Sequence, residues 1–125
     1  MHYLRCELFP QDLDASVDFY LDVLGFELER DERAASGYVS LRLGDIVVGL
    51  LRAWTAAEPE HRKPPVGVEL VLVVDDVVAV RDRVRARAWP IAEDLERRPW
   101  GLTDFRLLDP DGYYLRITQE PGIDP

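Results

Sequence analysis

The chain has 125 residues, an apolar share of 47%, a charged share of 31% and a formal net charge of −9. This length and composition are those of one ordinary folded domain, and no apolar run approaches the roughly 20 residues that a membrane-spanning helix needs. The acidic charge argues against a nucleic-acid partner, and it is compatible with attraction of a cationic small molecule or with solubility alone. The chain starts without the layout of a signal peptide, and its single cysteine, Cys6, excludes an internal disulfide, so we expect a cytoplasmic protein with no membrane partner.

The first half of the chain predicts one helix and four strands. Apolar and polar residues alternate near the N-terminus, which is typical of a strand. Asp12 or Asp14 then caps a helix with apolar residues at helical spacing, and Gly25 ends it. The Gly44-Asp45 pair favours a tight hairpin turn. The predicted strands span residues 2–9, 26–32, 38–43 and 46–51.

The same order of elements returns after residues 54–66, where three prolines and mixed charge indicate a linker. Asp75 or Asp76 caps a second helix, whose apolar stripe continues to Ala88. A turn with the sequence Asp-Pro-Asp-Gly at 109–112 closes the last hairpin. The strands predicted here span residues 68–74, 90–94, 103–108 and 113–118.

Two βαβββ units of similar length predict an α+β fold built by internal duplication. We expect one domain, with a first module over residues 1–53, a linker over 54–66, a second module over 67–119 and a tail over 120–125. A four-stranded sheet with one helix leaves its other face uncovered. Two such sheets side by side would form a curved, half-open mixed sheet around a cleft, with the helices outside, and a cleft between modules is a common place for a small-molecule ligand.

Two segments carry a resemblance to a known family. The helix with S-V-D-F-Y at 16–20, followed by V-L-G-F at 23–26, and the closing P-W-G at 99–101 with D-P-D-G at 109–112, resemble the vicinal oxygen chelate superfamily. That superfamily includes glyoxalase I, extradiol dioxygenases and bleomycin-resistance proteins, and the resemblance covers residues 3–119. One departure is Trp89, because the resemblance implies a glycine between helix and strand.

The resemblance also implies where enzymes of the superfamily would hold a metal ion. Matching the motif register places the four ligand positions, one on the first and one on the last strand of each module, at Arg5, Gly49, Glu69 and Arg116. A site for Zn²⁺, Fe²⁺ or Mn²⁺ needs three or four imidazole, carboxylate or thiolate ligands, and only Glu69 could serve. We therefore expect no metal and no other cofactor.

The charged residues at these positions have two interpretations. Arg5, Glu69 and Arg116 could meet near the place that a metal would take, with Glu7 balancing the second arginine, and their spare donors could hold a ligand's carboxylate or phosphate. Alternatively, the network only stabilises the fold.

Aromatic residues at the predicted cleft could bind flat, apolar or cationic ligands. We expect Phe9, Trp100 and Tyr114 to line it, with Trp100 in the loop that closes the second module. The alternative is that these rings are ordinary core.

The favoured hypothesis is a metal-free protein that binds a small molecule. The resemblance to the bleomycin-resistance branch implies that it could sequester an antibiotic or metabolite. That branch also implies a homodimer. The alternative is an enzyme of the same superfamily, of glyoxalase, dioxygenase or isomerase type, which either depends on a metal or uses Glu7 or Glu69 as a base. No catalytic residue stands out in the sequence.

Overall fold

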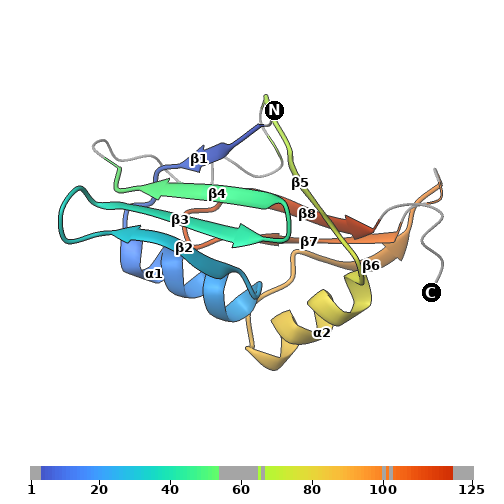
Figure 1. The fold of residues 1–125 in the computed structure, drawn as a ribbon. Coiled ribbons are helices and arrows are strands. Elements are labelled where there is room, and N and C mark those ends of the chain that lie inside the picture. The colour runs from blue at the N-terminus through green and yellow to red at the C-terminus, as the bar shows by residue number, and fades with distance from the viewer. Residues whose placement is uncertain (1–3, 54–64, 66, 100, 102, 120–125) are drawn as a thin grey trace. The chain divides into compact units, whose positions relative to one another are not determined.

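The computed structural model describes residues 4–53, 65, 67–99, 101 and 103–119. The chain divides into two compact units, residues 1–57 and 58–125, and each is described by itself. Each unit contains one mixed four-stranded sheet (Figure 1). Among the described residues, no helix is both long and apolar enough to cross a membrane.

The first unit contains four strands and one helical segment. Its sheet has the order β1-β4-β3-β2, in which β1 runs parallel to β4 and the other neighbours are antiparallel. The helical segment begins as an α-helix and ends as a π-helical turn. The elements are β1 (Cys6–Leu8), α1 (Leu13–Asp18), η1 (Phe19–Val23), β2 (Glu27–Glu32), β3 (Tyr38–Leu43) and β4 (Ile46–Leu51).

The second unit repeats this topology. Its sheet has the order β5-β8-β7-β6, with β5 parallel to β8 and the remaining pairs antiparallel. The elements are β5 (Leu70–Val74), α2 (Val77–Ala86), β6 (Glu93–Arg97), β7 (Thr103–Leu108) and β8 (Tyr114–Gln119). The repetition confirms the predicted α+β fold of paired βαβββ modules, whereas the module bounds and the cleft between modules stay predictions.

Each helix begins at an aspartate, and the structure decides between the sequence alternatives. The Asp12 carboxylate accepts a hydrogen bond from the Ala15 N–H at 3.0 Å, and the Asp76 carboxylate accepts one from the Ala79 N–H at 3.0 Å. A side-chain acceptor at this position satisfies one of the backbone donors that the first helical turn leaves unpaired. Asp12 and Asp76 are therefore the N-caps.

The core of each unit lies between its helix and one face of its sheet. In the second unit, Val77 and Val84 of α2 are buried on the same side as Phe105, Leu107 and Ile117 of the sheet. Full burial of side chains of this size contributes about 1.5–3 kcal/mol each. Because side chains alternate along a strand, the residues between these apolar positions project from the opposite face of the sheet.

The end of α2 differs from the expectation drawn from the resemblance. The left-handed position is Ala88, with φ +57°, and not Trp89. The Trp89 N–H bonds the Val84 carbonyl at 3.2 Å and the Ala88 N–H bonds the Arg85 carbonyl at 2.9 Å, which is the Schellman pattern. Trp89 therefore needs no glycine conformation, and its indole N–H donates to the Leu108 carbonyl.

The strand predicted at residues 90–94 is wrong in its bounds, since β6 spans Glu93–Arg97. Pro90 has no N–H with which to join a sheet ladder. The first backbone bond to β7 comes from Ala92, whose N–H bonds the Arg106 carbonyl at 2.7 Å. The strand therefore starts at Glu93, and not at Pro90 as predicted.

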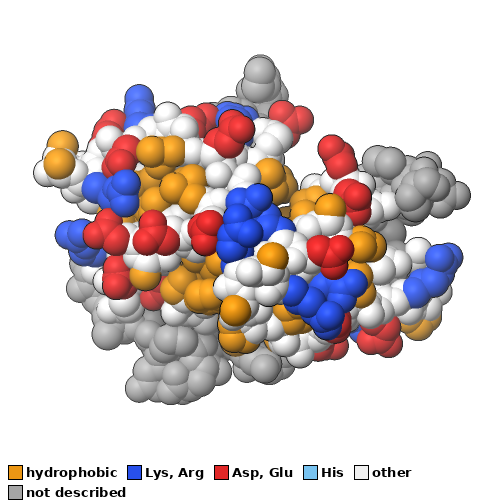
Figure 2. Space-filling view, turned by 90° about the horizontal axis from the view of Figure 1, so that it is seen from below, with side chains coloured by type: hydrophobic (Ala, Val, Ile, Leu, Met, Phe, Trp, Pro, Cys, Tyr) orange, Lys and Arg blue, Asp and Glu red, His pale blue; other side chains and the backbone are white. Residues whose placement is uncertain are grey.

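The exposed side of α2 carries arginines that are paired with acids. Arg81 lies 3.0 Å from Asp82 and 3.4 Å from Asp94, and Arg85 also pairs with Asp94. The face of the molecule seen in Figure 2 shows acidic and basic side chains interspersed. This pattern is typical of a solvated surface and not of a basic patch for nucleic acid.

Candidate functional site

In the first unit, a small polar cluster lies on β1, β3 and β4, on the sheet face opposite the core. The Arg5 Nη2 and Glu7 Oε1 atoms are 2.7 Å apart, and the Tyr38 hydroxyl donates to Glu7 Oε1 at 3.3 Å. Burial, and after it the negative charge of Glu7, raises the pKa of Tyr38. Arg5 and Glu7, two of the predicted site residues, are thus brought together.

Gly49 makes this cluster possible, because it lies directly opposite Glu7 on the neighbouring strand. A Cβ atom at residue 49 would be 1.9 Å from Glu7 Oε2 and 2.6 Å from the Tyr38 hydroxyl. Non-bonded atoms do not approach this closely, so the carboxylate of Glu7 occupies the space that a side chain at residue 49 would need. Gly49 therefore contributes to the site because the absence of a side chain there gives space to the Glu7 carboxylate.

In the second unit, β7 and β8 present a polar face away from α2. Register pairs Tyr114 with Leu108, Arg116 with Arg106 and Thr118 with Asp104, so all six lie on one face. Asp104 is only 1% exposed and Tyr114 only 7% exposed. A buried carboxylate on a sheet face away from the core is costly unless other groups compensate it.

Ion pairs and hydrogen bonds compensate the charges on this face. Arg116 Nε lies 2.8 Å from Glu69 Oε1, so the two remaining predicted ionic residues are also brought together. Arg98 Nε donates to Asp104 Oδ1 at 2.8 Å, and the Tyr114 hydroxyl donates to Glu93 Oε2 at 2.9 Å.

Two pKa values on this face follow from these contacts. The hydrogen bond from Tyr114 lowers the pKa of Glu93, with the charges of Arg106 and Arg98 acting in the same direction. Burial raises the pKa of Tyr114. The phenol and the carboxylate are therefore held in their neutral and ionised forms, respectively, over the ordinary pH range.

The four positions that the resemblance assigns to a metal do not fit one. Two of them are guanidinium groups, Gly49 has no side chain, and the remaining carboxylate, Glu69, is already paired with Arg116. Guanidinium groups cannot donate a lone pair to a metal, and their charge repels a cation. Among the described residues, no group of three or more histidine, cysteine, aspartate or glutamate side chains could hold a metal ion.

The predicted aromatic residues have different positions. Tyr114 is buried, and the guanidinium carbon of Arg106 lies 6.0 Å from the centre of its ring, within the range of a cation–π contact. Phe9 is 38% exposed at the end of β1. Trp100 lies outside the described residues. The prediction that Arg5 meets Glu69 and Arg116 stays a prediction, because they belong to different units.

Sequence reasoning missed four residues of the second sheet face: Glu93, Arg98, Asp104 and Arg106. Asp104 and Arg106 alternate with the apolar Phe105 and Leu107 along β7, so parity along this strand could have found them. Glu93 and Arg98 could not be found in this way, because the pairing of β6 with β7 shifts register between Glu93 and Glu96.

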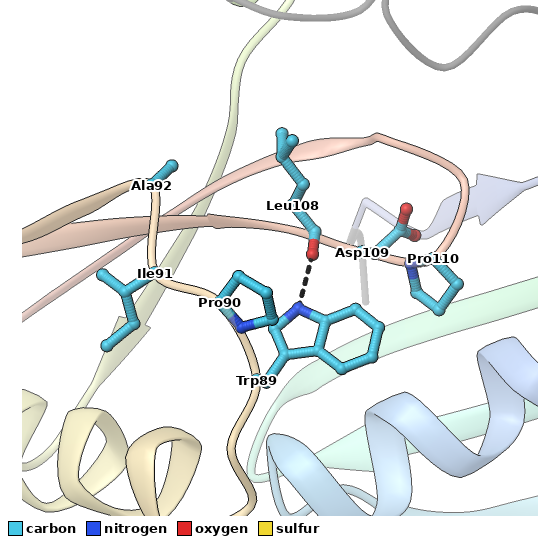
Figure 3. Close-up of a pocket in the computed structure, with 7 residues that line it drawn as sticks. All are labelled: Trp89, Pro90, Ile91, Ala92, Leu108, Asp109 and Pro110. Carbon is cyan, nitrogen blue, oxygen red and sulfur yellow. Dashed lines mark hydrogen bonds between the residues drawn. The ribbon is translucent and has the colours of Figure 1, made fainter.

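A separate pocket of about 480 Å³ lies in the second unit, between the α2–β6 connection and the β7–β8 turn. Figure 3 shows the Trp89 indole N–H pointing to the Leu108 carbonyl oxygen, to which it donates at 2.8 Å. Asp109, at the rim, accepts hydrogen bonds from the N–H groups of Asp111 and Tyr113 at 2.9 Å each, so its Oδ1 belongs to the turn.

Comparison with known proteins identifies relatives in two sets. A "Probable lactoylglutathione lyase" of Vibrio cholerae is 29% identical over 116 residues, which cover 86% of this chain and 83% of that protein. A protein of the same name from Synechocystis is 26% identical and covers 95% of each chain.

Solved structures of the same fold include a bleomycin resistance determinant encoded on the transposon Tn5, with a TM-score of 0.77, 24% identity and coverage of 97% of this chain and 99% of that one. TioX from Micromonospora has a TM-score of 0.76, 24% identity and coverage of 95% and 98%. The family model described as Glyoxalase/Bleomycin resistance protein/Dioxygenase superfamily matches residues 2–117. The chain belongs to this superfamily.

Proposed function

We propose that this protein binds a small molecule without a metal ion. The observation that carries the proposal is the occupation of the four family positions by Arg5, Gly49, Glu69 and Arg116, with both arginines in ion pairs at 2.7–2.8 Å. Family membership supports a small-molecule ligand. The likeness to a bleomycin resistance structure supports sequestration of an antibiotic or metabolite as the role.

A metal test comes first, because it separates binding from metal chemistry. Purified protein is incubated with Zn²⁺, Ni²⁺, Fe²⁺ and Mn²⁺ in turn, desalted, and its metal content is measured by mass spectrometry. We expect far less than one ion per chain. One tightly held ion per chain would contradict the proposal.

A ligand test follows, because a molecule that binds only the folded state raises the melting temperature. We propose a thermal-shift panel of bleomycin, cationic aromatic compounds and anionic aromatic compounds. A saturable rise with at least one class supports binding, and Arg116→Gln should change it while the exposed Arg85→Gln should not. The absence of any shift across the panel counts against sequestration.

The second candidate is an enzyme, which the names of the curated relatives favour. Glu7 and Glu69 would be the bases, but each is paired with an arginine. Formation of lactoylglutathione from methylglyoxal and glutathione, with and without added Zn²⁺ or Ni²⁺, tests this candidate. Turnover that Glu69→Gln abolishes would favour the enzyme.

We also propose a cytoplasmic homodimer, as the resemblance to the bleomycin-resistance branch implies. Light scattering on a sizing column measures the mass in solution. Twice the chain mass of 14.3 kDa is the expected result, and the mass of one chain would contradict it.

A further inference from the structure

Two arginines lie directly opposite each other on neighbouring strands of the second sheet. Arg106 on β7 pairs with Arg116 on β8, and both project from the face away from α2. Their side chains are only 17% and 23% exposed. Like charges opposite each other across an antiparallel pair destabilise a sheet, so this arrangement needs compensation.

The compensation is unequal. Arg116 lies 2.8 Å from Glu69, whereas the nearest carboxylate oxygens to Arg106, on Glu93 and Asp104, are both 3.8 Å away. That distance exceeds the 2.7–3.2 Å of an N–H···O hydrogen bond. The Nε atoms of both arginines are buried and have no hydrogen-bond partner among the residues that the structure describes, although Arg116 Nε lies within ion-pair distance of Glu69.

The two carboxylates are held at this distance by other groups. Asp104 receives Arg98 Nε at 2.8 Å, and Glu93 receives the Tyr114 hydroxyl at 2.9 Å. A hydrogen bond to the Tyr114 hydroxyl uses one donor of Arg106 and raises its pKa, whereas the Arg106 Nε–H is left without an acceptor among the described residues. A buried N–H without an acceptor loses its bonds to water and gains nothing in return.

We propose that Arg106, with Arg116 opposite it, binds an oxyanionic group of the ligand, such as a carboxylate or a phosphate. The inference rests on the proposed function and names the chemical class of its ligand. The planar guanidinium fork matches two oxygens of such a group, and charge-assisted bonds of this kind are short and strong. A bound oxyanion would also separate the two like charges with an opposite one.

The acidic neighbours determine the character of the binding. Glu69, Glu93 and Asp104 surround the arginines, so the long-range field does not favour an anion. Affinity must come from short bonds to Arg106, and we expect it to depend only weakly on salt compared with binding at an exposed basic patch.

The test uses three probes with the same ring: benzoate, benzamide and benzamidine, at constant ionic strength, with inorganic phosphate as a fourth. The full-length protein is labelled with ¹⁵N, and the Nε–H signals of its arginines are followed by NMR. We expect benzoate, phosphate or both to shift the Arg106 signal saturably, and benzamide and benzamidine to leave it unchanged. No saturable shift with either anion overturns the inference.

Variants separate the arginine fork from general charge. Arg106→Gln should weaken benzoate or phosphate binding at least about tenfold, which corresponds to about 1.4 kcal/mol. Arg106→Lys keeps the charge without the fork and should recover only part of the affinity. Arg85→Gln, which removes one charge from the exposed side of α2, should bind like the wild type. Equal losses in Arg106→Gln and Arg85→Gln, or no loss in Arg106→Gln, overturn the inference.

Failure of the oxyanion assignment can be distinguished from failure of the proposed metal-free binding. If benzamidine shifts signals on β7 and β8 and the anions do not, the protein still binds small molecules and the oxyanion assignment is wrong. If Arg106→Gln does not fold, the direct shift of the Arg106 signal in the wild-type protein decides the question. A stoichiometric metal ion would refute the metal-free function without bearing on the Arg106 measurement.

Discussion

Replacing Asp104 by Asn should destabilise the protein strongly, because its carboxylate is the most buried charge described on the second sheet face. Asp104 is 1% exposed, and its Oδ1 accepts the Arg98 Nε–H at 2.8 Å. Breaking a buried ion pair by removing one charge typically costs 3–5 kcal/mol. Arg98 keeps Glu96 at 3.1 Å, and asparagine still offers one acceptor, so we expect the lower end, about 3 kcal/mol.

A cost of that size lowers the melting temperature by roughly 10 °C in a chain of this length. Urea denaturation followed by circular dichroism gives the free energy of unfolding, and a double-mutant cycle with Arg98→Gln gives the coupling of the pair. The matched control is Asp94→Asn, whose carboxylate is 42% exposed and pairs with Arg85 and Arg81. An exposed pair contributes less than about 1 kcal/mol. If both variants lose the same amount, the reasoning from burial is refuted.

Three further predictions concern the backbone, the glycine of the first unit and pH. Ala88→Gly should stabilise the protein by about 0.5 kcal/mol in urea denaturation, because removing the strain of alanine in the left-handed conformation outweighs the gain in unfolded-state entropy. A lower free energy of unfolding in this variant would contradict the assigned strain. Gly49→Ala should leave the protein folded but displace the Glu7 carboxylate from the Tyr38 hydroxyl, so the pKa of Tyr38 should fall towards its usual value. NMR of tyrosine-labelled protein measures this pKa, and an unchanged pKa would mean that Glu7 had stayed in place. Because folding raises the Tyr114 pKa above its unfolded value, the stability that this group contributes is complete below about pH 10 and is lost as pH rises through the folded value. Denaturation at pH 9 and 11 should therefore show a smaller alkaline loss in Tyr114→Phe, and an identical loss would contradict the assignment.

Alternation and turn chemistry in the sequence predict most of the strands. The motif register of the resemblance placed Arg5, Glu69 and Arg116 at inward positions, and alternation placed Glu7 on the same face as Arg5. The structure pairs Arg5 with Glu7 and Glu69 with Arg116. The need of a helix for an N-cap limited the candidates to Asp12 or Asp14 and to Asp75 or Asp76, and the structure selects Asp12 and Asp76. These features depend on neighbours in the sequence.

Other features depend on contacts that no local pattern encodes. Arg98 follows β6, which shifts its register against β7, and donates to Asp104. A sequence period cannot reveal such a shift. The left-handed residue at the end of α2 is Ala88, and an alanine in the sequence does not predict a left-handed conformation. Trp89 could be recognised as unusual from the resemblance, but its bond to the Leu108 carbonyl is a tertiary contact.

The close approach of Glu7 to Gly49 has a consequence for how this chain can change by mutation. A glutamate introduced at residue 49, the simplest step towards a metal ligand there, would meet the carboxylate of Glu7 at 1.9 Å from its own Cβ. Because the contact is with the end of a flexible side chain, rotation of Glu7 could accommodate the new residue, and the ion pair between Glu7 and Arg5 would then be lost. A first step from this sequence towards a metal site would therefore add a carboxylate at residue 49 and break an ion pair of Glu7 on β1 at the same time.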